Sequence, residues 1–263
     1  MSPTQDNRAS PCERRIRAVL FDLGDTLLNF GKIEAGRLFA EGAQSSYEYL
    51  KSLGQAVGSF RLYFWRNLVN LRLQRLISAL RGRDFNALAL LERVGRRRGL
   101  RLTSEQWQHL AWRWYEPLSR ICRIEPQTRQ TLSKLRSAGL KLGIVSNTFV
   151  HASSLEKHLG QLGLVEFFSV RVYSYKYTFR KPDDRIFKIA VERIGQPAQN
   201  ILYVGDRIDK DIRPALRNGM VAVLKEAYTN FGKKLPVGAY RIARISELPA
   251  LIERLNAEWA RGG

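Results

Sequence analysis

The sequence predicts an α/β fold, a parallel sheet flanked by helices with a helical segment inserted after the first strand. Two observations carry this prediction. Beyond residue 124, short apolar runs alternate with amphipathic segments of about 10–15 residues, which is the pattern of strands and helices in a parallel sheet. Polar or charged residues stand where several of the apolar runs end, and open α/β sheets build their sites at that edge.

Strands are expected where apolar residues form short continuous runs. They lie at 16–21, 140–145, 167–172, 201–204 and 221–224, with a last strand near Arg241. Helices are expected where apolar residues recur every three or four positions, at 126–139, 151–162, 183–194, 209–218 and 246–255. Pro126 suits the first turn of its helix and Gly139 suits the position after the last turn, which supports the bounds of that helix.

Residues 31–123 show a helical period, so we expect a small helical bundle there. Within 58–82, two apolar stripes run along one helix. One stripe holds Leu62, Trp65, Val69, Leu76 and Leu80, and the other holds Phe60, Phe64, Leu68 and Leu71. A helix that is apolar on two sides is expected to lie between neighbouring elements. Thr103 is expected to start a later helix, and Pro117 is expected to end it.

These patterns divide the chain into three parts. Residues 1–15 are polar, contain two prolines and show no periodicity, so we expect a disordered tail. Residues 16–30 and 124–263 are expected to form the core that contains the sheet, and residues 31–123 the helical insert. A length of 263 residues and a hydrophobic fraction of 44% are sufficient for a packed core of that kind.

Composition favours a soluble, cytoplasmic protein. The longest apolar runs are far too short to span a bilayer, and the apolar stretch after Arg17 is too short for a secretory signal. The two cysteines, Cys12 and Cys122, are too few for a disulfide framework. We therefore expect no membrane partner, and either a monomer or a homodimer.

The chain is strongly basic. Forty-four lysines and arginines face 24 aspartates and glutamates, which gives a formal net charge of +20. Between residues 57 and 101, eleven arginines face only Asp84 and Glu92. Such a field concentrates anionic ligands and attracts nucleic acid at low salt. An arginine-rich proteome or a solvated face is the simpler explanation, and weak binding of nucleic acid is the alternative.

Four short segments place reactive groups at the ends of expected strands. They are FDLGDTL at 21–27, IVSNT at 144–148, RKPD at 180–183 and VGDRIDKD at 204–211. Asp22 directly follows an apolar run, so its carboxylate is expected at the tip of the strand, where it could attack phosphorus. An aspartate that stabilises a turn or a helix start is the alternative interpretation of this position.

Ser146 and Asn147 follow the second expected strand, where a hydroxyl group and backbone amides can hold phosphate oxygens. Ser-Asn-Thr is also ordinary chemistry for the start of a helix, which is the commoner role of such a triplet. Lys181 precedes Pro182, and the proline fixes the direction in which the lysine leaves the chain. Its ammonium group can neutralise charge on a nucleophile and on a phosphate.

Asp206 and Asp211 form the strongest acidic pair. Asp206 follows the strand expected at 201–204, and Asp211 lies one turn into the next helix, with Asp209 between them. Carboxylates this close repel each other, and Mg²⁺, which prefers hard oxygen ligands, relieves the repulsion. A helix N-terminus also favours aspartate, and we assign that simpler role to Asp209.

In this order, the four segments resemble the motifs of the haloacid dehalogenase-like (HAD) superfamily, with a similarity that runs from about residue 16 to residue 256. The resemblance implies a Rossmann-like core and a helical cap at 31–123 that closes over it. It implies Asp22 as the nucleophile, Ser146 on the phosphate and Lys181 as the charge anchor. It also implies Mg²⁺ bound by Asp22, Asp206, Asp211 and the backbone carbonyl group of Gly24.

One position departs from the phosphatases of this family. They usually carry Asp-x-Asp, whose second aspartate protonates the leaving alkoxide, but here that position is Gly24, and Asp25 follows one residue later. A metal contact made by the backbone carbonyl group survives the change to glycine, whereas proton transfer by a side chain does not. General acid catalysis contributes roughly 10²–10⁴-fold, so poor leaving groups should react slowly unless Asp25 substitutes for the missing acid.

The motifs favour a Mg²⁺-dependent phosphatase of a small phosphorylated metabolite, which acts through an aspartyl-phosphate on Asp22. The alternative is a catalytically weakened relative that binds RNA or the ribosome through its basic insert, an interpretation supported by Gly24 and by the arginines of 61–101. A 2-haloacid dehalogenase would use the same Asp22 without a metal. The acidic pair Asp206 and Asp211 argues against that third possibility.

Overall fold

The computed structural model describes residues 15–261. Its centre is a six-stranded sheet in the order β3-β2-β1-β4-β5-β6, in which every neighbouring pair is parallel. The strands are β1 (Ala18–Phe21), β2 (Lys141–Ser146), β3 (Val170–Tyr173), β4 (Ile201–Gly205), β5 (Val221–Lys225) and β6 (Tyr240–Ile242). The chain moves outward from β1 to β3, and then returns to build β4 to β6 on the other side. The strand order therefore reverses between β1 and β4, which is the position where such sheets bind ligands.

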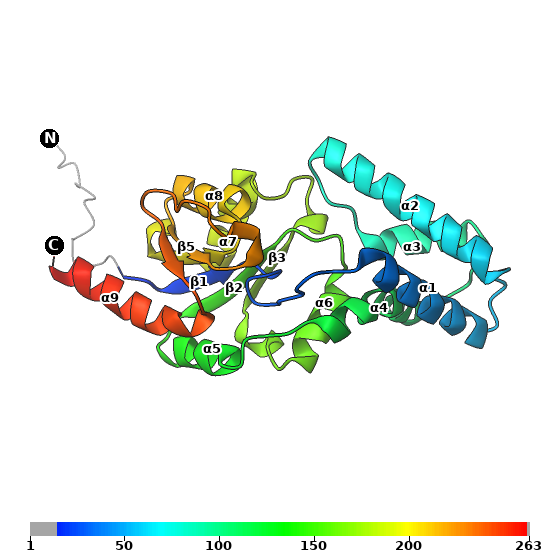
Figure 1. The fold of residues 1–263 in the computed structure, drawn as a ribbon, viewed down its shortest axis with the longest axis horizontal. Helices are drawn as coiled ribbons and strands as arrows, with labels where there is room; N and C mark the ends of the chain where they lie inside the picture. The colour runs from blue at the N-terminus through cyan, green and yellow to red at the C-terminus, as the bar shows by residue number, and fades with distance from the viewer. Residues whose placement is uncertain (1–14, 262–263) are drawn as a thin grey trace, which may run out of the picture.

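Helices cover both faces of the sheet (Figure 1). They are α5 (Thr128–Ser137), α6 (Ala152–Gln161), α7 (Asp184–Ile194), α8 (Arg213–Arg217) and α9 (Leu248–Arg261). Buried side chains of α5, α6 and α9 form one hydrophobic cluster with the sheet, and those of α7 and α8 form a second. The predicted α/β class, with a parallel sheet flanked by helices, is confirmed.

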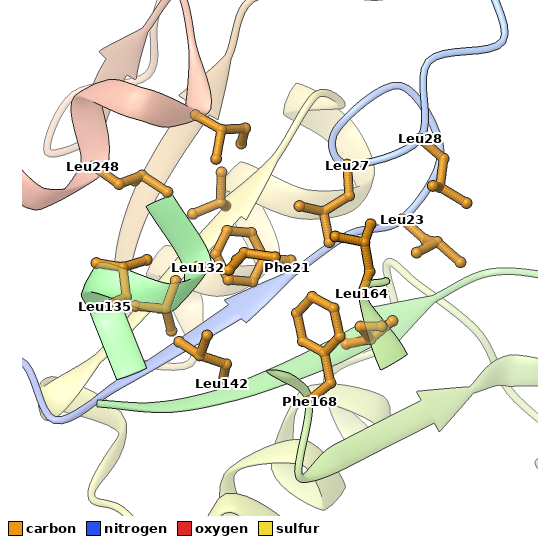
Figure 2. Packing of buried hydrophobic residues seen from close by; sticks show 14 of the residues in the cluster. Phe21, Leu23, Leu27, Leu28, Leu132, Leu135, Leu142, Leu164, Phe168 and Leu248 are labelled. Atoms are coloured by element: carbon orange, nitrogen blue, oxygen red, sulfur yellow. The ribbon is translucent and has the colours of Figure 1, made fainter. Parts of the chain in front are cut away.

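The first strand shows why both faces need cover. All four residues of β1 are fully buried. Because side chains alternate along a strand, Val19 and Phe21 join the cluster with α5 and α9, whereas Ala18 and Leu20 join the cluster with α7 and α8. On the first face, the ring of Phe21 meets the ring of Phe168 edge to face, with 6.1 Å between centroids (Figure 2).

The first four of the five helices between β1 and β2 form the helical insert. They are α1 (Ala35–Ser52), α2 (Phe60–Arg81), α3 (Ala87–Arg96) and α4 (Ser104–Ile121). The insert has a hydrophobic cluster of its own, in which Leu50 and Trp107 are fully buried. Gly42 lets α1 approach α4 closely, since a Cβ atom there would lie 3.0 Å from the backbone oxygen of Trp114. Figure 1 shows the insert beside the sheet rather than over one of its faces.

Most predicted elements agree with the observed ones to within a few residues. The strand predicted at 167–172 begins at Val170, because Val165–Phe167 form a 3₁₀ turn before it. The helix start predicted at Thr103 is confirmed, and its side chain accepts a hydrogen bond from the backbone of Gln106. Apart from residue 15, the tail predicted at 1–15 lies outside the described residues.

Two predictions for the helical insert are wrong. Pro117 lies inside α4, which continues to Ile121. A proline removes one hydrogen bond of the helix, and the burial of Tyr115 and Pro117 itself holds the last turn in place. The second error concerns α2, which packs on α1 through Phe60 and Phe64 but leaves its other apolar stripe exposed to solvent.

The described part of the chain has no helix that is both long and apolar enough to cross a membrane. Cys122 is a buried free thiol, and Cys12 lies outside the described residues.

Candidate active site

Asp22 emerges where β1 ends. Its backbone amide donates a hydrogen bond of 2.8 Å to the carbonyl oxygen of Val204, so the ladder between β1 and β4 continues up to this residue. Because β1 ends at Phe21, Asp22 stands at the carboxyl edge of the sheet. The strand-tip position predicted for Asp22 is therefore the observed one.

Lys181 joins two carboxylates beneath the surface. Its ammonium Nζ lies 2.6 Å from Asp22 Oδ1 and 2.6 Å from Asp211 Oδ1, and it donates to the hydroxyl group of Tyr203 at 3.1 Å. Only 3% of Lys181 is exposed. Burial alone would lower the pKa of Lys181, but the carboxylates of Asp211 and Asp22 outweigh that effect and hold the pKa well above its ordinary value.

Asp206 completes the acidic group. Its carboxylate accepts a hydrogen bond from the hydroxyl group of Thr229, and its backbone oxygen accepts one of 2.8 Å from the side-chain amide of Asn230. Burial raises the pKa of Asp206 to about 6, although the Thr229 hydrogen bond opposes the rise. Burial likewise raises the pKa of Asp22 to about 7, and Lys181 opposes part of it.

The charges of this group do not balance. Asp22, Asp206 and Asp211 are all buried, and each offers a carboxylate oxygen within 4.8 Å of the others. Lys181 is the cation that contacts two of them, so full ionisation leaves two negative charges uncompensated in a buried place. Hard oxygen donors with an excess of two charges suit a divalent cation such as Mg²⁺, which fits this donor set.

The turn after β4 is built around Asp211. A Cβ atom on Gly205 would lie 2.5 Å from the Cβ of Asp211, so only glycine fits at that position. Asp211 lies in a π-helical turn, Ile208–Ile212, and its Oδ2 accepts a 3.0 Å hydrogen bond from the backbone amide of Arg207. Asp209 lies in the first turn of the same helix, is exposed and pairs with Arg207 at 3.0 Å, so it stands outside the buried group.

Asn147 holds the backbone of Lys181. Its side-chain amide donates to the carbonyl oxygen of Lys181 at 2.8 Å, and its side-chain oxygen accepts from the amide of Lys181 at 2.9 Å. Both polar ends of Asn147 are therefore engaged, which makes it a positioning residue for the lysine in this structure. Ser146 is buried at the end of β2, in register with Tyr173 of β3.

Gly24 and Asp25 follow the first strand, but the structure does not bring Asp25 into the carboxylate group. Asp25 has a left-handed backbone with φ of 55°. Burial raises its pKa, and hydrogen bonds from the side chain of Tyr228 and the backbone of Phe30 oppose the rise. A Cβ atom on Gly24, the position at which the sequence lacks the second aspartate of Asp-x-Asp, would meet nothing within 4 Å.

The helical insert touches the same edge of the sheet through the loop that joins α2 to α3. Asp84 of that loop accepts hydrogen bonds of 2.5 Å from Ser174 and 2.6 Å from Arg180, which follow β3. The ring of Phe85 stacks on the ring of Phe149 at 5.0 Å. These contacts fix the insert beside the strand ends that carry the carboxylates.

The sequence pattern did not indicate three residues that shape the group: Tyr203, Thr229 and Asn230. Tyr203 lies inside an apolar strand and looks like core, yet its hydroxyl group donates to Asp211 at 3.2 Å and to the carbonyl oxygen of Val145 at 3.3 Å. Thr229 and Asn230 lie more than twenty residues after Asp206, in a loop without periodicity. A polar residue within a buried strand is the one signal that could have singled out Tyr203.

Comparison with known proteins agrees with this geometry. A family model described as haloacid dehalogenase-like hydrolase matches residues 16–219. A glyceraldehyde 3-phosphate phosphatase of Methanocaldococcus jannaschii is 34% identical over 140 residues, which make up 52% of this chain and 60% of that protein. The match thus spans less than two thirds of the relative's own length.

Two solved structures share the fold. A HAD phosphatase from Thermococcus onnurineus superposes with a TM-score of 0.57 at 24% identity, covering 90% of this chain and 98% of that one. A 2-haloacid dehalogenase from Pseudomonas syringae pv. Tomato gives 0.59 at 24% identity, covering 91% and 99%. Because these two proteins carry names of different chemistries, the likeness establishes the fold and does not choose between them.

Proposed function

The chain belongs to the haloacid dehalogenase-like hydrolases, and from this premise we propose that it is a Mg²⁺-dependent phosphatase of small phosphorylated metabolites. The observation that carries the proposal is the buried group of Asp22, Asp206 and Asp211 around Lys181, with its excess of negative charge. The printed name of the relative from Methanocaldococcus jannaschii supports a substrate of the size of a triose phosphate.

Asp22, Asp206 and Asp211, together with the backbone carbonyl group of Gly24, would hold the ion. When bound, Mg²⁺ supplies Lewis-acid stabilisation of the charge that develops on the phosphoryl oxygens. Lys181 keeps its ammonium group beside Asp22, which favours the ionised form of that carboxylate and orients it for attack. Asn147 keeps Lys181 in place through its backbone. Ser146, at the end of the neighbouring strand, is proposed to donate to a phosphoryl oxygen.

The reaction proceeds in two displacements at phosphorus. A carboxylate oxygen of Asp22 forms a bond to phosphorus while the ester P–O bond breaks and its electron pair leaves with the alkoxide. A water molecule then attacks the aspartyl-phosphate, which releases inorganic phosphate and restores the carboxylate. The leaving alkoxide must gain a proton, and the position that usually supplies it is Gly24. We therefore propose that Asp25 or water donates this proton inefficiently, and that esters whose leaving groups have a low pKa are preferred.

A dehalogenase is the competing chemistry, since it would use Asp22 on carbon instead of phosphorus. Such a reaction has no use for three buried carboxylates whose charge exceeds that of the neighbouring lysine. Keeping them ionised costs free energy unless a cation balances them. The acidic group therefore favours the phosphatase.

The test is release of phosphate from an aryl phosphate, measured with Mg²⁺ and with excess EDTA. Asp22→Asn should lower the rate by roughly 10³-fold or more, because a neutral amide is a poor nucleophile. Asp209→Asn is the matched control, since Asp209 lies between Asp206 and Asp211 in the sequence but is exposed and pairs with Arg207. Activity that persists in Asp22→Asn or in EDTA, or that fails equally in Asp209→Asn, would contradict the proposal.

A further inference from the structure

Six large apolar side chains lie exposed on the outer face of α2. They are Leu62, Trp65, Val69, Leu73, Leu76 and Leu80, with exposed fractions from 44% for Leu62 to 78% for Leu80. We call this set the α2 stripe. Single exposed apolar residues are ordinary, but a contiguous row of them marks a surface that contacts something apolar.

The stripe lies opposite the face that holds α2 to the protein. At about 100° per residue, its six members fall within an arc of roughly 80°. Phe60 and Phe64 lie on the other side of the helix, where their rings contact Tyr47 and Phe39 of α1. In Figure 1, α2 runs along the edge of the insert, and its C-terminal end approaches the core, where the loop after it contacts residues that follow β3. Within residues 15–261, the stripe therefore stays exposed to solvent.

Arginines border the stripe. Arg61, Arg66, Arg72, Arg75 and Arg81 belong to α2 and are exposed, and the helix contains no aspartate or glutamate. On the same helical wheel, Arg61 and Arg72 flank one side of the stripe and Arg66 flanks the other. An occupant of this face must therefore offer an apolar layer together with negative charge beside it.

We propose that α2 docks on the surface of an anionic phospholipid bilayer. The stripe would enter the boundary between headgroups and acyl chains, while the bordering arginines bind lipid phosphates, which is how basic amphipathic helices lie on membranes. A helix that lies on a membrane differs from one that spans it, and five arginines exclude α2 from spanning. The expectation of no membrane partner, which came from the absence of a spanning segment, does not cover this mode.

Charge decides against a second copy of the chain as the occupant. Pairing two copies through the stripe would bring the bordering arginines of one copy, Arg61, Arg66 and Arg72, toward those of the other, with no acidic residue in either helix. Nucleic acid matches the arginines but offers no apolar layer for a row of leucines. An anionic bilayer supplies both components. This inference depends on α2 alone and stands apart from the proposed phosphatase activity.

The experiment is co-sedimentation of the full chain with vesicles. Vesicles of equal parts phosphatidylglycerol and phosphatidylcholine should carry the protein down, and vesicles of phosphatidylcholine alone should carry much less, because the arginines then lack their partners. The double variant Val69→Gln/Leu76→Gln should bind the anionic vesicles about tenfold to a hundredfold more weakly. Both positions are exposed, so the melting temperature should remain that of the parent.

The control is the double variant Phe231→Gln/Val237→Gln, which removes two exposed apolar side chains elsewhere on the molecule and should bind like the parent. Equal binding by parent and stripe variant would overturn the proposal, because charge alone would then explain the attraction. So would a parent dimer in sedimentation equilibrium that the stripe variant turns into a monomer. A parent that binds RNA but neither vesicle, with RNA binding lost in the stripe variant, would overturn it as well.

Discussion

Charged side chains are buried and paired at the edge of the sheet, whereas on helix α2 they are exposed to solvent. At the sheet edge, Asp22, Asp211 and Lys181 are buried and lie within hydrogen-bond distance of one another. On α2, five arginines are exposed among exposed apolar side chains. Buried charges cost free energy and persist only with partners, whereas exposed arginines cost little. A dense run of charge in a sequence therefore does not by itself identify a reactive site, and burial together with a partner does.

Removal of the Lys181 ammonium group should destabilise the sheet edge more than any other change considered. Lys181→Met leaves Asp22 and Asp211 buried without their shared partner, so the free energy of unfolding should fall by about 3–5 kcal/mol at pH 8 in EDTA. The loss should be smaller at pH 5, because burial raises the pKa of Asp22 to about 7 and this carboxylate can then take up a proton instead. Urea unfolding measures both values.

Lys188→Met is the control for that measurement, since Lys188 is exposed on α7 and its loss should change stability by no more than about 0.5 kcal/mol. An equal effect of the two variants would mean that the buried lysine does not compensate the carboxylates.

His158 offers a second way to probe a buried group, this time one that must stay neutral. It is buried on α6, its Nδ1 lies 2.9 Å from the hydroxyl group of Tyr115, and burial lowers its pKa to about 4 from an ordinary 6.5. The unfolded chain binds the proton more readily, so the stability that neutral His158 provides is present above pH 6.5 and is lost as the pH falls to 4. The loss amounts to about 3 kcal/mol.

Unfolding free energies measured from pH 7 to pH 4 check this slope. His158→Gln cannot take up this proton. Between pH 7 and pH 4, its free energy of unfolding should therefore fall by about 3 kcal/mol less than that of the parent. The partner residue provides a control, because Tyr115→Phe keeps the histidine and should keep the slope. Parallel curves for parent and His158→Gln would show that this histidine ionises freely in the folded protein.

At position 24, the sheet edge has a glycine in place of a carboxylate that could protonate the leaving group. Gly24→Asp should raise the rate for alkyl phosphates by up to about 10²-fold and change the rate for aryl phosphates little, because only poor leaving groups need the proton. The Cβ atom of the new side chain would meet nothing within 4 Å. A series of phosphate esters with graded leaving-group pKa values, measured on parent and variant, reports the effect as a change of slope. A flat dependence in the parent would indicate another acid, and Asp25→Asn would then remove it.

The strand-end positions could be predicted because they depend on local pattern alone. An apolar run followed by an aspartate places that residue at the tip of a strand, and parallel strands bring their tips to one edge. The pattern therefore predicted that Asp22, Asp206 and Asp211 lie at one edge of the sheet, and the resemblance to the HAD motifs added Lys181 to them. The contacts of Asn147 and Tyr203 could not be predicted, because each bonds to residues many positions away whose distance depends on how the loops pack.

The environment of α2 could not be predicted for a related reason. A helical pattern tells which residues share a face, but it does not tell what covers that face. Both stripes of α2 were correctly placed on a helix, yet only the side of Phe60 and Phe64 has a neighbour in the described structure. Pro117 shows the same limit, since tertiary packing keeps α4 helical beyond a residue that usually ends helices.

The smallest expected effect concerns the stripe itself. Leu80→Ala should change the free energy of unfolding by no more than about 0.5 kcal/mol, because 78% of Leu80 is already exposed to water in the folded protein. Leu50→Ala, the matched change at a fully buried leucine of α1, should cost about 2–5 kcal/mol. Urea unfolding of both variants at two protein concentrations measures the contrast. A large loss of unfolding free energy in Leu80→Ala that depends on protein concentration would mean that another copy of the chain covers the stripe in solution. The side chains of α2 would then be buried between two copies, and those of the sheet edge within one.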